Sequence, residues 1–301
     1  MEIVKLSPSA YQLHDTTSCV NVGLVVTSDG AVLIDTGSSA DMARKIQSRI
    51  REVTEQPVVY VISSHWHPEH TRGNGSFDVP VIAHQACRAR MEQHKQACGG
   101  ESTHGQSDAG TGGGCEGTAR STISFDHDGY LYVGGTLLEL IHVPGHTEGS
   151  IAVHLPSEGV LFASDTVFVG TPPVLDHSDP VRWLESLARL EKLHASLIVP
   201  GQGRVACPDD LSHLLLYLRS QVASLESEAM REATTRGDES RESGRGDRTL
   251  PPGMVRLNRA ARGGGRNVGD EGDRLARLAA GGDSSALVED SLTGAKRIAS
   301  R

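Results

Sequence analysis

The chain has 301 residues, 29 Lys and Arg against 38 Asp and Glu, a formal net charge of -9 and 37% hydrophobic residues. Together with 34 Gly, 13 Pro and 5 Cys, this composition excludes collagen-like, fibrous and disulfide-stapled proteins and is typical of a globular one. The odd number of cysteines without C-x-x-C spacing predicts reduced thiols. Neither an apolar run of about 18 residues nor a secretion signal is recognisable, so we expect a cytoplasmic protein without a membrane partner.

The charged and aromatic residues are distributed unevenly along the chain. Residues 221–301 contain no His, Cys, Phe, Tyr or Trp, and they hold 14 basic and 13 acidic residues. Residues 1–220 are left with 15 basic and 25 acidic residues, a net charge of -10. Nucleic-acid binding requires a positive surface, so this acidity argues against a nucleic-acid partner.

Apolar runs and turn residues predict strands alternating with helices. The earlier predicted elements are two antiparallel strands within 19–35, a helix at 40–52, strands at 58–64 and 80–84, and a helix at 85–97. The later ones are strands at 122–125, 130–133, 136–143, 150–155 and 160–163, a helix at 180–193, a strand at 196–200 and a helix at 208–227. This order predicts an α/β fold with sheets inside and helices outside.

Two segments are predicted to lie outside this core. Residues 98–120 are rich in Gly, Ser and Thr, which predicts a mobile surface insertion that is either a plain loop or a lid over a site. Residues 226–301 have few large apolar side chains and charges of both signs, which predicts a disordered tail with a weak helix at 273–280.

The strongest chemical signal is the segment HWHPEH at residues 65–70. His65 and His67 are two residues apart in an extended segment, so both side chains point to one side and can bind one ion. If the backbone turns at Pro68, the side chains of Glu69 and His70 could face a point next to the ion bound by His65 and His67. Three histidines at this spacing could also occur by chance. The motif therefore indicates a metal site only if other parts of the sequence supply further ligands.

Other polar residues follow predicted strands in the same way. His146 comes after LLELIHV and the bend PG, Asp165 after VLFAS, and Gln202 after SLIVP. Catalytic side chains tend to collect where strands end, and one shared site explains all of these positions.

These motifs together resemble the metallo-beta-lactamase superfamily of zinc-dependent hydrolases. The matching segments, in the order and at the spacings of the family, are IDTG (34–37), HWHPEH (65–70), PGHTEGS (144–150), ASDT (163–166) and VPGQG (199–203). The resemblance spans about residues 4–218. It implies a four-layer alpha-beta-beta-alpha sandwich, with residues 1–225 as the catalytic domain and the metals at one edge.

The resemblance also implies roles for individual residues. His65, His67 and His146 would hold the first metal, and Asp165 matches the bridging aspartate of the glyoxalase II-like, thioesterase-like branch. Glu69 and His70 match an Asp and a His of the second metal position, where Gln202 replaces a further His. A buried aspartate that supports the ligand loops would be Asp35.

Two departures from the family pattern concern the second metal position. Glu69 is one methylene longer than Asp, and the amide of Gln202 is a weaker zinc donor than imidazole. One zinc ion is therefore expected to bind tightly and the second weakly or not at all. Three His with Asp165 or water still make a competent zinc site. Glu69 could be a ligand, the base that orients a water, or a spectator.

Three functions remain open at this stage. The leading one is a hydrolase that uses a zinc-bound hydroxide to cleave a small ester, thioester, lactone or lactam. The second is a mononuclear iron persulfide dioxygenase using His65, His146 and Asp165. The third is a binding protein with a degenerate site, suggested by Glu69 and Gln202. His177 could contact substrate and Trp66 could line the pocket, while substrate identity and oligomeric state are left open.

Overall fold

The structure of the protein is a computed structural model that describes residues 1–99, 121–170, 172–175 and 177–242. The predicted insertion, apart from its first two residues, and the weak helix predicted at 273–280 lie outside these residues. Contacts divide the chain into two units, Met1–Leu225 and Glu226–Arg301. The sheets and every predicted site residue belong to the first unit, and the following paragraphs describe that unit.

A seven-stranded sheet forms the first half of this unit, and its strands lie in chain order. They are β1 (Glu2–Lys5), β2 (Ala10–His14), β3 (Asn21–Thr27), β4 (Gly30–Ile34), β5 (Val58–Ile62), β6 (Val81–His84) and β7 (Ile123–Phe125). The strands β1 to β4 are antiparallel, and β4 to β7 are parallel. The sequence analysis did not predict β1 or β2. The strand β1 is a mostly exposed edge strand without a buried apolar face.

A five-stranded sheet forms the second half. Its spatial order is β12 (Leu197–Pro200), β11 (Val160–Ser164), β10 (Ile151–Leu155), β9 (Thr136–His142) and β8 (Gly129–Val133). Apolar residues on the facing sides of the two sheets, such as Val32, Ile62, Val153 and Phe162, form one buried cluster. The two sheets therefore pack face to face around a common core.

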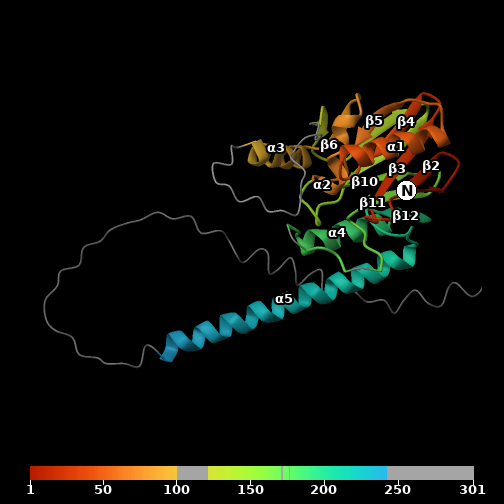
Figure 1. Ribbon diagram of the computed structural model, residues 1–301. Helices are drawn as coiled ribbons and strands as arrows, with labels where there is room; N and C mark the ends of the chain where they lie inside the picture. Colours follow the sequence, from red (N-terminus) through yellow and green to blue (C-terminus); the bar gives the residue numbers. More distant parts are fainter. Residues whose placement is uncertain (100–120, 171, 176, 243–301) are drawn as a thin grey trace, which may run out of the picture. The chain divides into compact units, whose positions relative to one another are not determined.

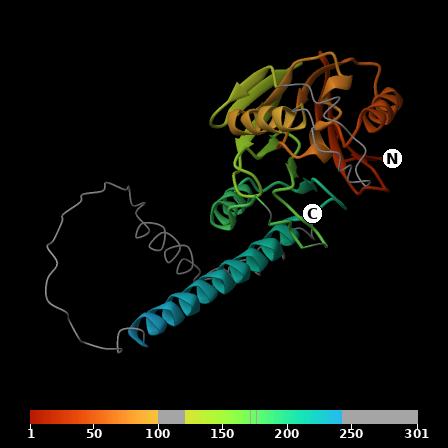
Figure 2. The same ribbon diagram turned by 60° about the vertical axis from the view of Figure 1, so that its left-hand side comes forward.

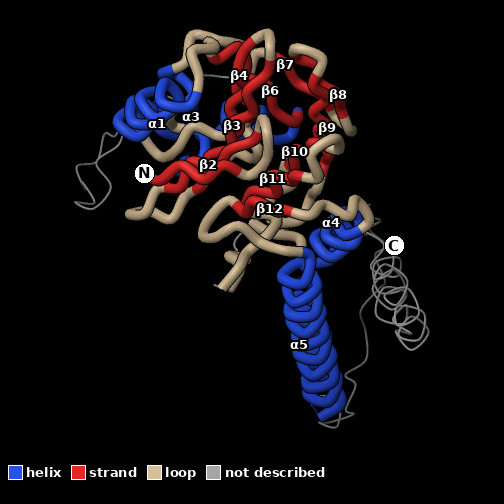
Figure 3. The backbone as a smooth tube through the Cα atoms, turned by 90° about the vertical axis from the view of Figure 1, so that its right-hand side faces the viewer, coloured by secondary structure: helices blue, strands red, loops and turns tan. Residues whose placement is uncertain are grey.

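Helices cover the outer face of each sheet. On the first sheet lie α1 (Ala40–Val53) and α3 (Gln85–Gly99), and on the second lie α4 (Pro180–Glu191) and the beginning of α5 (Pro208–Glu242). The packing of these helices is visible in Figures 1 and 2. Figure 3 shows the strands gathered between α1 and α3 on one side and α4 on the other. The predicted four-layer α/β sandwich is confirmed.

The ends of the helices follow from local chemistry. The Met42 amide donates to Oγ of Ser39 at 3.1 Å, which caps α1, and Oδ1 of Asp179 accepts from two amides at the start of α4. The helix α5 runs to Glu242, past its predicted end near residue 227. Residues 226–242, assigned from the sequence to a disordered tail, are thus helical. They are rich in Glu and Arg, which favour a helix, but they lack the periodic apolar residues from which a helix is recognised in a sequence. Among the described helices, none has both the length and the apolarity needed to span a bilayer.

Candidate metal centre

The predicted metal ligands come from loops at one edge of the two sheets. His65 and His67 follow the end of β5, His146 follows β9, and Asp165 follows β11. The Ile151 amide of β10 donates to the Ser64 carbonyl after β5 at 2.8 Å, which joins the two sheets beside these loops. A short helix, α2 (Pro68–Thr71), begins at Pro68 and returns His70 toward the same point.

Three imidazole nitrogens meet at the centre of this edge. Nδ1 of His67 lies 3.1 Å from Nε2 of His65 and 3.0 Å from Nε2 of His146. Oδ2 of Asp165 lies 3.9 Å from the His65 nitrogen and 3.8 Å from the His146 nitrogen. Two nitrogens bound to one tetrahedral zinc ion are about 3.3 Å apart. The four side chains therefore have the spacing of a metal site.

The protonation of these histidines also suits a metal ion. Burial, followed by the neighbouring histidines, lowers the pKa of His65 well below its usual value. Burial likewise lowers the pKa of His67, and it lowers the pKa of His146 to about 4. All three rings are therefore neutral near pH 7, so each can offer a nitrogen lone pair to a cation. This donor set fits a divalent metal.

A second group of possible ligands lies beside the first and consists of Glu69, His70 and Asp165. Nε2 of His70 lies 3.4 Å from Oδ1 of Asp165, and neither buried atom has a hydrogen-bond partner among the described residues. Burial would lower the pKa of His70, but the carboxylates of Asp165 and Asp35 outweigh it and hold this pKa well above its usual value. The carboxylates of Asp35 and Asp165 thus favour a positive charge between them. This charge could be a proton on the His70 ring or a metal ion.

Gln202 lies at the same edge of the sheets. Its Nε2 donates to Oδ2 of Asp165 at 3.4 Å, so the amide contacts a predicted metal ligand. The residue before it has no room for a side chain, because a Cβ at Gly201 would lie 1.8 Å from Oδ1 of Asp165. The turn therefore passes close to Asp165, and Gln202 stands where the family resemblance implies a His.

Asp35 supports the ligands from behind. Its Oδ1 accepts from the Ser64 amide at 2.8 Å, and its Oδ2 accepts from Nδ1 of His70 at 2.9 Å and Oγ of Ser64 at 2.7 Å. The hydroxyls of Ser64 and Ser164 are 2.6 Å apart. Asp35 and Ser164 both have positive φ, 64° and 49°, which is a sparsely populated conformation for these residues. Neither serine was predicted to belong to the site, although each directly precedes a predicted ligand.

A buried amide network that no sequence pattern predicts holds the turn that carries Gln202. Nδ2 of Asn21 donates to the carbonyls of Pro200 and Gly203, both at 2.8 Å. Oδ1 of Asn21 accepts from Nε2 of Gln12 at 2.7 Å, and this Gln12 nitrogen also reaches the Gly203 carbonyl at 3.2 Å. Asn21 and Gln12 are 3% and 2% exposed. The strands β2 and β3 thus fix the position of a turn far away in sequence.

Replacing Asn21 with alanine is expected to lower the free energy of unfolding by about 2 kcal/mol, because it removes the side-chain donor from two buried carbonyls. Urea denaturation measures this change. Ser18→Ala is the control, since the hydrogen bonds of this exposed serine are to Asp15 and to the nearby Val20 amide, and their loss should change stability by about 0.5 kcal/mol or less. Equal stabilities of the two variants would contradict the assigned role of Asn21.

The opening of the metal centre is lined by aromatic and basic side chains around Trp66. The Trp66 ring lies 4.5 Å from that of His67, 5.6 Å from that of His177 and 6.0 Å from that of His94. The guanidinium of Arg90 lies 5.8 Å from the Trp66 ring. The exposed His177, with φ of 64°, is 6.1 Å from His67 and lies at the rim rather than among the predicted ligands.

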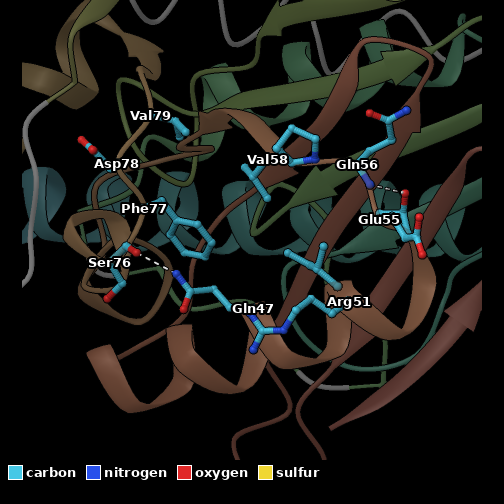
Figure 4. Close-up of a pocket in the computed structure, with 12 residues that line it drawn as sticks. Gln47, Arg51, Glu55, Gln56, Val58, Ser76, Phe77, Asp78 and Val79 are labelled. Atoms are coloured by element: carbon cyan, nitrogen blue, oxygen red, sulfur yellow. Dashed lines mark hydrogen bonds between the residues drawn. The ribbon is translucent and has the colours of Figure 1, made fainter.

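A separate cavity lies away from the histidines. Figure 4 shows this cavity of about 590 Å³, which is lined by residues including Gln47, Arg51, Val58 and Phe77. Val58 is the first residue of β5, whereas His65 follows the end of that strand. The cavity is thus at the other end of β5 from the metal centre, and its lining contains no histidine. We therefore place the candidate site at the histidine cluster.

Two curated proteins are similar to this chain over part of its length. The chain is 21% identical over 243 residues to a linear primary-alkylsulfatase of a Pseudomonas species, which covers 69% of this chain and 46% of that protein. It is 26% identical over 136 residues to a hydroxyacylglutathione hydrolase of Erythrobacter litoralis, which covers 45% of each chain. The chain thus spans about half the length of these relatives.

The fold has clear structural counterparts. A metallo-beta-lactamase from Pontibacter korlensis is similar with a TM-score of 0.58 and 23% identity, covering 72% of this chain and 98% of that one. The family model of the metallo-beta-lactamase superfamily matches residues 17–202, a range that includes all of the predicted ligands. The chain belongs to the metallo-beta-lactamase superfamily.

Proposed function

We propose that the protein is a zinc-dependent hydrolase of small esters, thioesters, lactones or lactams. The observation that carries the proposal is the meeting of three neutral imidazole nitrogens beside the buried carboxylate of Asp165. A divalent metal held there would act as a Lewis acid toward a carbonyl and would lower the pKa of a coordinated water. The hydrolytic names of the two relatives described above support this class of reaction.

In this proposal some side chains of the site bind the metal, and another transfers a proton. His65, His67 and His146 would hold the metal, and the carboxylate of Asp165 would add an anionic oxygen to the same site. Glu69 is half-buried at the start of α2, where its carboxylate can accept a proton from the attacking water or complete the second metal position. The amide of Gln202 holds Asp165 by donating to Oδ2.

Metal analysis combined with a substrate panel tests this proposal. The protein purified without added metal is expected to contain zinc, to lose hydrolysis of the panel on chelation, and to regain it when zinc is restored. About one iron per chain with oxygen uptake on a persulfide would instead establish the mononuclear iron oxygenase. A metal-loaded protein that turns over none of the esters, thioesters, lactones and lactams would favour the degenerate binding protein.

The amide at Gln202 predicts unequal metal positions. The wild-type protein is expected to bind one zinc ion tightly and a second weakly or not at all, since an uncharged amide is a poor zinc ligand. Gln202→His is expected to raise the second affinity by about tenfold to a hundredfold, the range by which neighbouring groups modulate metal sites. Calorimetric zinc titration measures both affinities.

The matched control for this titration is Gln56→His, which adds an imidazole in the cavity at the other end of β5. This variant should bind zinc as the wild type does at both positions. The proposed place of Gln202 beside the second metal position would be contradicted by two equally tight zinc sites in the wild type. It would also be contradicted if Gln202→His had no higher affinity for the second zinc ion.

A further inference from the structure

A pair of serine hydroxyls lies behind the metal centre, one from each half of the sandwich. Ser64 follows the end of β5 in the seven-stranded sheet, and Ser164 is the last residue of β11 in the five-stranded sheet. Their Oγ atoms are 2.6 Å apart, and the two residues are 1% and 7% exposed. The next residues along the chain are His65 and Asp165. The hydroxyl pair therefore joins the sheets at the points where two predicted ligands leave them.

The Ser64 hydroxyl has more neighbours than it has protons. Its Oγ lies 2.7 Å from Oδ2 of Asp35, 2.6 Å from Oγ of Ser164 and 3.0 Å from Nδ1 of His65. A hydroxyl can donate a single proton, and an ionised carboxylate can only accept one. The short contact with Asp35 therefore takes the Ser64 proton. The Ser64 oxygen then accepts from the other two groups, so Ser164 and Nδ1 of His65 are both donors.

This direction of the hydrogen bonds determines the tautomer of His65. A neutral imidazole carries one proton, and here that proton is on Nδ1, where it is donated to Ser64. Nε2 then keeps a free lone pair, and this is the atom that lies 3.1 Å from Nδ1 of His67 at the predicted metal position. The opposite tautomer would place a proton at that position. The hydrogen bond made by one ring nitrogen of a histidine decides which nitrogen can bind a metal.

The backbone of Ser164 gives an independent indication that its hydroxyl has a role. Its φ is 49°, a conformation that residues other than glycine rarely adopt and that glycine adopts without steric cost. Glycine would relieve this strain, but it would lack the proton donor for Ser64. The second contact of the Ser164 hydroxyl, to Oδ2 of Asp35, is longer at 3.4 Å. The main partner of Ser164 is thus the Ser64 oxygen.

We propose that Ser64 and Ser164 are positioning residues that hold His65 in the Nδ1–H tautomer and so preform the first metal position in the metal-free protein. This inference rests on the proposed function only in taking His65 as a metal ligand, and it does not depend on the substrate. If the two serines only filled space, removing a hydroxyl would leave the tautomer of His65 unchanged.

NMR spectroscopy of the metal-free protein with isotope-labelled histidine tests the tautomer directly. Near pH 7, the wild-type His65 ring is expected to be protonated on Nδ1 and not on Nε2. In Ser64→Ala the ring is expected to populate both tautomers, because Nδ1 has lost its main acceptor. The signals that disappear in His65→Gln identify those of His65. This measurement requires neither bound metal nor turnover, so its outcome is independent of the hydrolytic activity.

Zinc titration of the serine variants provides the second readout. Ser64→Ala and Ser164→Ala are each expected to weaken the tight zinc site by about tenfold or more, the effect typical of groups that support a metal ligand. Ser164→Gly should be at least as stable as Ser164→Ala and should bind zinc as weakly. Ser64→Thr keeps the hydroxyl and should retain the wild-type tautomer and affinity. The control is Ser121→Ala, since Ser121 is also 1% exposed but donates to the Ile123 carbonyl outside the site.

Three results would overturn the inference. They are a wild-type His65 protonated on Nε2, an unchanged His65 tautomer in Ser64→Ala, and wild-type zinc affinity in Ser164→Gly. Failure of the wild type to bind zinc would instead contradict the proposed function, and the tautomer of His65 would still decide the role of the serines.

Discussion

His146→Ala is expected to abolish metal-dependent hydrolysis and to weaken binding of the tight metal ion by more than about 100-fold. Loss of a group that merely supports a ligand costs about 10-fold to 100-fold in metal affinity, and His146 is a direct donor in the proposed site. Its Nε2 lies 3.0 Å from Nδ1 of His67 and 3.8 Å from Oδ2 of Asp165. Without it, two imidazoles and a carboxylate remain, which is a weaker set for zinc.

Metal content after dialysis and hydrolysis of the ester and thioester panel check this expectation. His67→Ala is the companion variant, because His67 is half-exposed and its removal leaves a smaller internal gap than loss of the buried His146. The control is His127→Ala, which removes an exposed imidazole outside the cluster. Wild-type turnover in either of the first two variants would refute the site assignment, provided circular dichroism shows all three to be folded.

Trp183→Ala is expected to lower the free energy of unfolding by about 3–5 kcal/mol, the largest stability effect that we expect for a single residue here. Trp183 is fully buried on α4, in the cluster that joins this helix to the five-stranded sheet. Its Nε1 donates to the Thr166 carbonyl at 2.8 Å, just after Asp165. Its backbone also meets the bend before His146, where a Cβ at Gly145 would lie 2.4 Å from Cα of Trp183.

Trp183→Phe separates packing from the hydrogen bond. It keeps most of the ring volume but leaves the Thr166 carbonyl without its donor, so we expect a loss of about 1–3 kcal/mol. Because Trp183 touches the loops of both His146 and Asp165, metal affinity should fall together with stability in both variants. Urea denaturation with parallel zinc titration tests this link, and an alanine variant as stable as wild type would contradict it.

Much of the fold was predictable because its buried strands and amphipathic helices have strong local patterns. The strands β4, β5, β10 and β11 are short apolar runs, and α1 repeats Met42, Ile46 and Ile50 on its buried face. The exposed strand β1 and the polar end of α5 have no such pattern and were missed. Local periodicity reports burial, so elements that bury little are not visible to it.

The candidate site was predictable where its residues stand next to strand ends. His65, His146 and Asp165 each follow an apolar run, and the structure brings them together. Asn21 and Gln12 were not recognisable, because their partners are backbone carbonyls of Pro200 and Gly203, almost the whole domain away in sequence. The bond of Trp183 to the Thr166 carbonyl was not recognisable either, because it depends on a tertiary contact that no local pattern reports.

The predicted metal ligands follow strands of both sheets, and this has a consequence for the lifetime of the protein. His65 and His67 follow β5 of the seven-stranded sheet, whereas His146 follows β9 and Asp165 follows β11 of the five-stranded one. An ion held by all four would act as a removable cross-link, since the sheets could not separate without releasing it. At a free metal concentration 100 times the dissociation constant, such binding adds about 2.7 kcal/mol to stability. The zinc concentration would then set how often the chain unfolds far enough for proteases to cleave it, as well as the rate of substrate turnover.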